Sequence, residues 1–95
     1  MSLTIEFLSL PNVVKMIGGK TITIEFAGQT AEGLIRQVTE KYGKKVQQFL
    51  LDENGRLDMM FRILRNNEEW IQSEHMQRPL RDGDRIAIML LAAGG

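Results

Sequence analysis

Apolar residues recur at helical spacing over one long segment, residues 31–42, which lies between stretches where apolar and polar residues alternate. Thr30 stands at the expected N-cap, Glu32 suits the positive end of the helix dipole, and Gly43 follows as a C-terminal stop. The apolar stripe lies on one face of a helix and is formed by Ala31, Leu34, Ile35, Val38 and Tyr42. A helix of this kind, flanked by strands, has to bury its stripe against a sheet.

Strict alternation predicts the strands. Residues 10–19 are expected to be a connection, because Pro11 and Asn12 open it and Gly18 and Gly19 close it. A tight turn is expected at Asn66 and a second short helix over 44–51. The predicted strands cover residues 3–9, 20–26, 60–65, 70–71 and 85–91.

The order of these elements predicts an α+β fold. A hairpin, a crossing helix and further strands form one sheet with a helix on one face. A right-handed crossover places the last strand beside the first. We therefore expect a β-grasp domain over residues 1–91, with a mixed sheet of four to five strands and one main helix packed on one face. Residues 92–95 are expected to form a flexible C-terminal tail.

Composition excludes several classes of function. The chain of 95 residues has no cysteine, which excludes disulfides, thiolate metal ligands and a cysteine nucleophile. Twelve basic residues balance twelve acidic ones, so no broad electrostatic attraction to nucleic acid or anionic lipid is expected. Neither a signal peptide nor a membrane span of about 20 apolar residues is recognisable. We expect a cytoplasmic protein.

Candidate metal, phosphate and acid–base sites are weak. His75 is the single histidine, and Asp52, Glu53 and Asp58 lack the spacing of a calcium loop. Gly19 and Lys20 precede a strand rather than a helix, which argues against a phosphate-binding loop. We expect no metal, no bound cofactor and no catalytic group of the chain's own.

The two glycines at the C-terminus, Gly94 and Gly95, are the strongest functional candidate. Glycine lacks a Cβ and can enter narrow channels. About four extended residues beyond the last strand reach roughly 13–14 Å, which would place the terminus in another protein's active site. A carboxylate is a poor electrophile, so its use as an acyl donor requires activation, for which an acyl-adenylate serves.

The sequence resembles the MoaD/ThiS family of ubiquitin-like sulfur carriers over nearly the whole chain, most closely MoaD, the small subunit of molybdopterin synthase. The segment from Pro79 to Ile88, followed by Ala93, Gly94 and Gly95, is similar to the family ending PLxDGDxVxxxPPxxGG. Residues 63–68 are similar to the family's VLVNGE strand and turn.

The resemblance implies that Gly95 is adenylated and converted to a thiocarboxylate, with Gly94 and Ala93 forming the tail that enters the partner. It implies that ATP is used by the activating partner, an E1-like adenylyltransferase of the MoeB/ThiF type. The implied sulfur acceptor is the large subunit of molybdopterin synthase (MoaE type) or another sulfur-accepting enzyme. Neither nucleic acid nor a membrane is an implied partner.

The sequence departs from the family pattern where Met89, Leu90 and Leu91 replace the usual two prolines, and residues 51–60 are longer than in compact members. Such departures are compatible with a ubiquitin-like modifier joined to lysines, or with a carrier for thiamine, cysteine or tRNA thiolation. A third alternative is a β-grasp interaction module with an inert tail.

Alternation along the last strand predicts a partner-binding patch. Ala87, Met89 and Leu91 alternate with inward-facing residues, so we expect them to form an exposed apolar patch that docks the activating enzyme.

Overall fold

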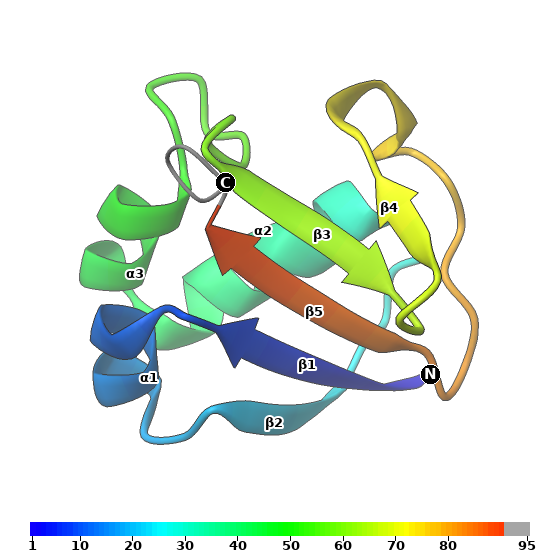
Figure 1. Cartoon of the computed structure of the whole chain (residues 1–95), viewed down its shortest axis with the longest axis horizontal. Helices are drawn as coiled ribbons and strands as arrows, with labels where there is room; N and C mark the ends of the chain where they lie inside the picture. Colours follow the sequence, from blue (N-terminus) through cyan, green and yellow to red (C-terminus); the bar gives the residue numbers. More distant parts are fainter. Residues whose placement is uncertain (91–95) are drawn as a thin grey trace.

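The computed structural model describes residues 1–90, in which a five-stranded mixed sheet carries its main helix on one face (Figure 1). The strands are β1 (Ser2–Leu8), β2 (Thr21–Glu25), β3 (Phe61–Arg65), β4 (Glu69–Ile71) and β5 (Arg85–Leu90). The helices are α1 (Pro11–Ile17), α2 (Ala31–Tyr42), α3 (Lys44–Leu50) and the 3₁₀ turn η1 (Ser73–His75).

The sheet has the order β2-β1-β5-β3-β4, as a β-grasp requires. β1 pairs antiparallel with β2 and parallel with β5, which confirms the crossover that places the last strand beside the first. β3 pairs antiparallel with both β5 and β4. β5 is therefore the central strand and is held on both sides.

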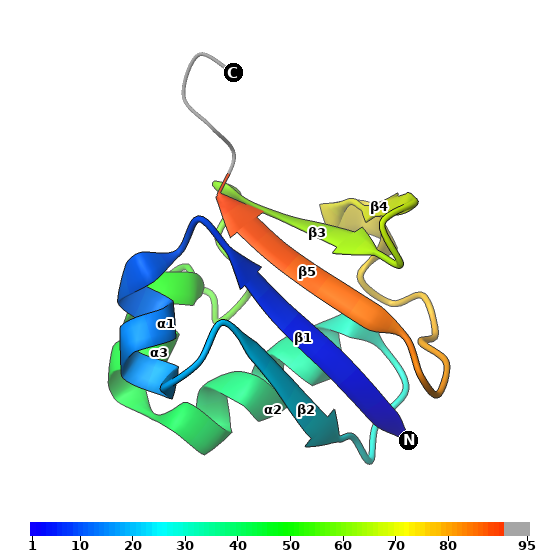
Figure 2. The same cartoon turned by 60° about the horizontal axis from the view of Figure 1, so that its bottom comes forward.

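The core lies between the sheet and α2. Ile5 of β1, Ile86 and Ile88 of β5, and Leu34 and Val38 of α2 are fully buried. Alternate residues of each strand point to this side, so the sequence period of two becomes the inner face of the sheet. Figure 2 shows α2 crossing beneath the strands.

The main helix has the predicted bounds because its ends are marked by local chemistry. The hydroxyl of Thr30 accepts a hydrogen bond from the backbone N–H of Gly33 at 3.2 Å. Gly43 ends the helix with φ 90°, a left-handed value that an L side chain rarely adopts. The charges at its ends also suit the helix dipole, since Glu32 lies in the first turn and Lys41 in the last.

The connection expected over residues 10–19 contains a helix that the sequence analysis did not predict. Residues 11–17 form α1, which begins with Pro11 at a first-turn position where its fixed φ is favourable. Val13 is completely buried, and Gly18 closes the helix in the left-handed conformation. Two turns are too short for a helical period to be read from sequence, so only the proline and glycine at its ends marked it.

Within residues 1–90, none of the helices combines the length and apolar character needed to cross a bilayer.

Candidate functional site

The last strand leads directly to the predicted functional terminus. β5 ends at Leu90, which lies opposite Phe61, the first residue of β3. β5 runs parallel to β1, so the C-terminal ends of both strands lie at the same end of the sheet. The predicted site residues Leu91, Ala93, Gly94 and Gly95 lie outside the described residues. The structure defines β5, the strand that precedes these residues in the chain.

The turn before β5 sets the register of this strand. Gly83 has φ 86°, and its N–H donates to the carbonyl of Ser2 at 2.8 Å. The carboxylate of Asp82 in turn accepts from the N–H of Ser2 at 2.6 Å. The Asp-Gly-Asp sequence therefore ties the entrance of β5 to the beginning of β1.

Asp84 is the buried charge of this turn. Its carboxylate accepts hydrogen bonds from the N–H of Arg81 at 2.8 Å and the amide of Asn66 at 2.9 Å, and pairs with the guanidinium of Arg65 at 2.9 Å. Burial raises the pKa of Asp84, but these three donors outweigh it and hold the pKa below the ordinary value of 3.8. The network joins the β3–β4 turn to β5 and has a structural role.

The sheet face turned away from α2 is the open face, defined by the residues that the strand register places on it. It has a polar flank on β1 and β2 and an apolar centre around β5 and β3. An ion pair between Arg85 and Glu6 at 3.3 Å separates the two parts. The apolar centre is formed by Leu8, Leu64, Trp70, Ala87 and Met89, and the register also places Arg62 on this face, opposite Met89.

The predicted exposure of Ala87 was wrong. Ala87 lies on the open face, yet only 2% of its surface is accessible. It is paired with Glu6 on one side and Leu64 on the other, and these longer side chains flank its methyl group. Met89 is half-buried on the same face. Of the predicted patch, Met89 is therefore the described residue that offers a side chain to a partner.

Leu90 lies on the same face as Ile86 and Ile88, as alternation predicts, but it is not buried. It is 41% exposed. Its partner Phe61 is the first residue of β3, so the sheet ends here and the core no longer covers this position.

Three exposed apolar residues were missed, namely Met59, Met60 and Trp70. Trp70 lies opposite Leu64 on the edge strand and is 51% exposed, and Met59 before β3 is 86% exposed. A two-residue turn at Asn66 and Asn67 would have paired Trp70 with Ile63 on the inner face. The loop instead holds three residues, 66–68, and this register pairs Trp70 with Leu64 on the open face. No sequence pattern marked Met59.

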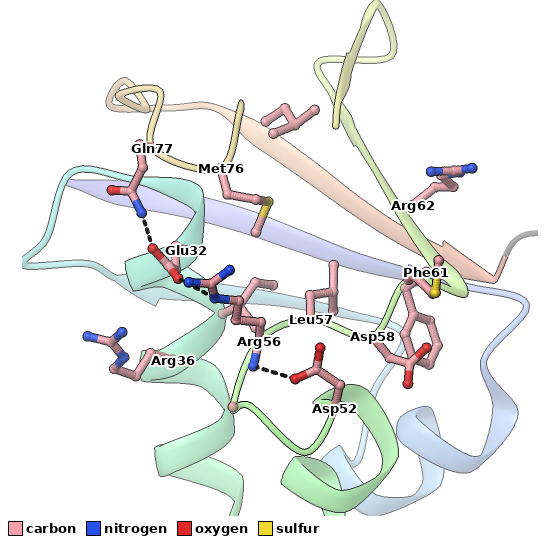
Figure 3. A pocket seen from close by; sticks show the side chains of 14 residues that line it. Glu32, Arg36, Asp52, Arg56, Leu57, Asp58, Phe61, Arg62, Met76 and Gln77 are labelled. Carbon is pink, nitrogen blue, oxygen red and sulfur yellow. Dashed lines mark hydrogen bonds and ion pairs between the residues drawn. The ribbon is translucent and has the colours of Figure 1, made fainter. Parts of the chain in front are cut away.

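A cavity of about 640 Å³ lies on the helix side of the sheet (Figure 3). It is bordered by α2 and by the long loop over residues 51–60. Among residues 1–90, no group of three or more histidine or acidic side chains is arranged to hold a metal ion.

Comparisons with known proteins agree with this architecture. A family model described as the ThiS family matches residues 12–95. SAMP1 from Haloferax volcanii is 16% identical, with full coverage of both chains and a TM-score of 0.78. CysO in the Amycolatopsis orientalis BexX/CysO complex is 24% identical over 98% of this chain and 99% of that one, with a TM-score of 0.71.

Urm1 from Trypanosoma brucei is 21% identical over 99% of this chain and 95% of that one, with a TM-score of 0.72. At these identities the structural likeness establishes the β-grasp fold. A sequence search of curated proteins gave no significant match.

Proposed function

The chain belongs to the ThiS family, and on this premise we propose that it is a sulfur carrier whose C-terminal Gly95 is the acyl group that is activated. In the proposed reaction, the Gly95 carboxylate attacks the α-phosphate of ATP in a partner enzyme, and pyrophosphate leaves. Hydrosulfide supplied by a sulfur donor then attacks the acyl carbon and expels AMP, and loss of the S–H proton leaves the thiocarboxylate. Gly94 and Ala93 are proposed to thread into the partner's active site.

The observation that carries this proposal is the extent of the family match, which runs to residue 95 and so includes the diglycine end. The fold supports it, because β5 is the central strand and is held by β1 and β3. A terminus that continues from such a strand is presented from a rigid base. The chain acts in this proposal as carrier and substrate, while the partner supplies the catalytic groups and binds ATP.

We propose that the activating enzyme docks on the apolar centre of the open face. Met89 and Trp70 offer apolar surface there, and Leu91 would extend it beyond the described residues. Aromatic residues and methionine are enriched at the centres of protein interfaces. Ala87 contributes through its small size. Its methyl group lies between the longer side chains of Glu6 and Leu64, so the surface is shallowly recessed there.

Molybdopterin synthesis is the proposed destination of the sulfur, with a MoaE-type large subunit as acceptor. The support is the likeness of residues 79–88 to the MoaD ending. Protein modification is the second candidate, because solved structures of similar fold are titled small archaeal modifier protein 1, including that from Methanosarcina acetivorans at 20% identity. In that case a lysine amine, rather than sulfur, attacks the activated Gly95.

A pyrophosphate-exchange assay tests the activation step. The full chain, with an E1-like adenylyltransferase of the MoeB/ThiF type and ATP, should support exchange of pyrophosphate into ATP. The chain lacking Gly95 should support none while keeping its fold. Equal exchange with and without Gly95 would refute the acyl-donor role.

A further inference from the structure

The cavity beside α2 is a groove with an apolar floor. Its apolar floor is formed by residues from α2, the long loop, β3, β4 and the segment after η1, namely Ile35, Leu57, Phe61, Ile71 and Met76. Its volume of about 640 Å³ is within the range of about 300–1,000 Å³ that ligand sites occupy. The groove lies on the helix side of the sheet and is separate from the open face.

The wall of the groove is a preorganised loop. The Asp52 carboxylate accepts hydrogen bonds from the N–H groups of Asn54 and Arg56 at 2.8 and 3.1 Å. The N–H of Asp52 donates to the carbonyl of Arg56 at 2.7 Å, and Leu51 forms a β-bridge with Leu57. The backbone that carries Arg56 is thus fixed without use of its side chain.

The carboxylates of the groove already have partners within the chain. Glu32 accepts from the amide of Gln77 and lies 4.0 Å from the guanidinium of Arg56 (Figure 3). Asp52 caps its own loop, and Asp58 accepts from the N–H of Met60 at 3.0 Å. The acidic groups are therefore less available to an incoming ligand than their number suggests.

The cations of the groove remain available. Arg36 lines it, and its guanidinium makes no hydrogen bond or ion pair to any part of residues 1–90. Arg62 borders the groove, but the strand register places it opposite Met89 on the open face. Arg56 has one ion pair, at the 4.0 Å limit, and its side chain is 77% exposed. Guanidinium groups bind carboxylates through paired hydrogen bonds. The guanidinium groups of the groove therefore have free N–H donors that can bind a carboxylate.

We propose that this groove binds a short segment of a partner protein in which aliphatic side chains are flanked by aspartate or glutamate. The aliphatic side chains fill the floor between Leu57 and Met76, and the flanking carboxylates pair with Arg36 and Arg56. Met59, beside the groove, closes over the segment as a flexible apolar side chain. The proposal does not depend on the chemistry of the terminus.

Three heptapeptides test the proposal on the full chain. Each has three central aliphatic residues, with two flanking residues on either side that are acidic, basic or small and neutral. We expect the acidic peptide to bind with the strongest affinity and to perturb the backbone NMR signals of α2 and residues 51–60. Binding of the basic peptide with equal affinity, or no binding of the acidic peptide at millimolar concentration, overturns the proposal.

Variants locate the site. The double substitution Arg36→Glu and Arg56→Glu should weaken binding of the acidic peptide by at least about tenfold, because charge-assisted hydrogen bonds are lost. Lys15→Glu with Lys20→Glu makes the same charge change on exposed residues outside the groove and should leave binding unaltered. An equal loss in both double variants would show only a general charge effect and refute the site. The chain lacking Gly95 should bind the peptide normally.

Discussion

The guanidinium of Arg65 lies 2.9 Å from the carboxylate of Asp84, and both side chains are largely shielded from solvent. Arg65 ends β3, while Asp84 immediately precedes β5. The pair therefore connects the two strands at the end of the sheet opposite the C-terminus of β5. Together with Asn66, it fixes the position from which the central strand starts.

Asp84→Asn should destabilise the protein at neutral pH by about 2–4 kcal/mol, because it leaves Arg65 without its buried counter-charge. The free energy of unfolding in urea measures this loss. Glu69→Gln removes the other, more exposed carboxylate near Arg65 and should cost much less. Equal costs in the two variants would contradict the role given to Asp84.

The stability that Asp84 provides should depend on pH. Its pKa is lowered in the folded state, so the contribution is present above the unfolded value near 3.8 and is lost as the pH falls through the lower folded value. The difference in unfolding free energy between the wild type and Asp84→Asn should therefore shrink below pH 3.8. A difference that stays constant down to pH 2 would contradict the assignment.

Thr30→Ala should destabilise the protein by about 0.5–2 kcal/mol through loss of the N-cap of α2. The Thr30 hydroxyl accepts from the N–H of Gly33, and alanine cannot replace it. Thr30→Ser keeps the oxygen and should retain most of the stability. The midpoints of thermal unfolding of the wild type and the two variants measure these differences. An alanine variant as stable as the serine variant would show that the Thr30 cap does not stabilise α2.

Gly33→Ala should stabilise the protein by about 0.5–1 kcal/mol, because alanine has the higher helix propensity. An added Cβ would lie 3.4 Å from the ring of Phe26, an ordinary contact. Gly83→Ala is the opposite case, since its φ of 86° disfavours any L side chain. Urea unfolding should show opposite signs, and destabilisation by Gly33→Ala would indicate that α2 needs closer contact with Phe26.

Met89→Asp should weaken binding of the activating enzyme by at least about tenfold while leaving the fold intact, because a carboxylate would be desolvated at the centre of the interface. Thr23→Asp places the same charge on β2, at the far side of the open face. Calorimetric titration of both variants with the enzyme separates local from general effects. Unchanged affinity for Met89→Asp would place the docking surface elsewhere.

The sequence was informative wherever local chemistry determines local structure. Thr30 and Gly43 mark the ends of α2, and alternation predicted β1 and β5 with their parallel contact. Burial on the open face could not be predicted in this way. Ala87 is hidden because of Glu6 and Leu64, and these neighbours come from strands distant in sequence.

The groove was equally hidden from sequence analysis. The extra length of residues 51–60 was recognisable, but its role as a wall depends on hydrogen bonds to Asp52 and on the approach of Gln77 to Glu32. Glu32 and Arg36 are four residues apart on α2, a spacing at which opposite charges can pair. The structure instead joins Glu32 to Gln77 and Arg56, which leaves Arg36 available.

The mass of the intact protein isolated from its native cell tests the central proposal most directly. We predict a population in which one oxygen of the Gly95 carboxylate is replaced by sulfur, and its absence from the chain lacking Gly95. Lysine-linked conjugates that leave a diglycine remnant would instead identify a protein modifier. An unmodified chain whose function survives removal of Gly95 would contradict the account.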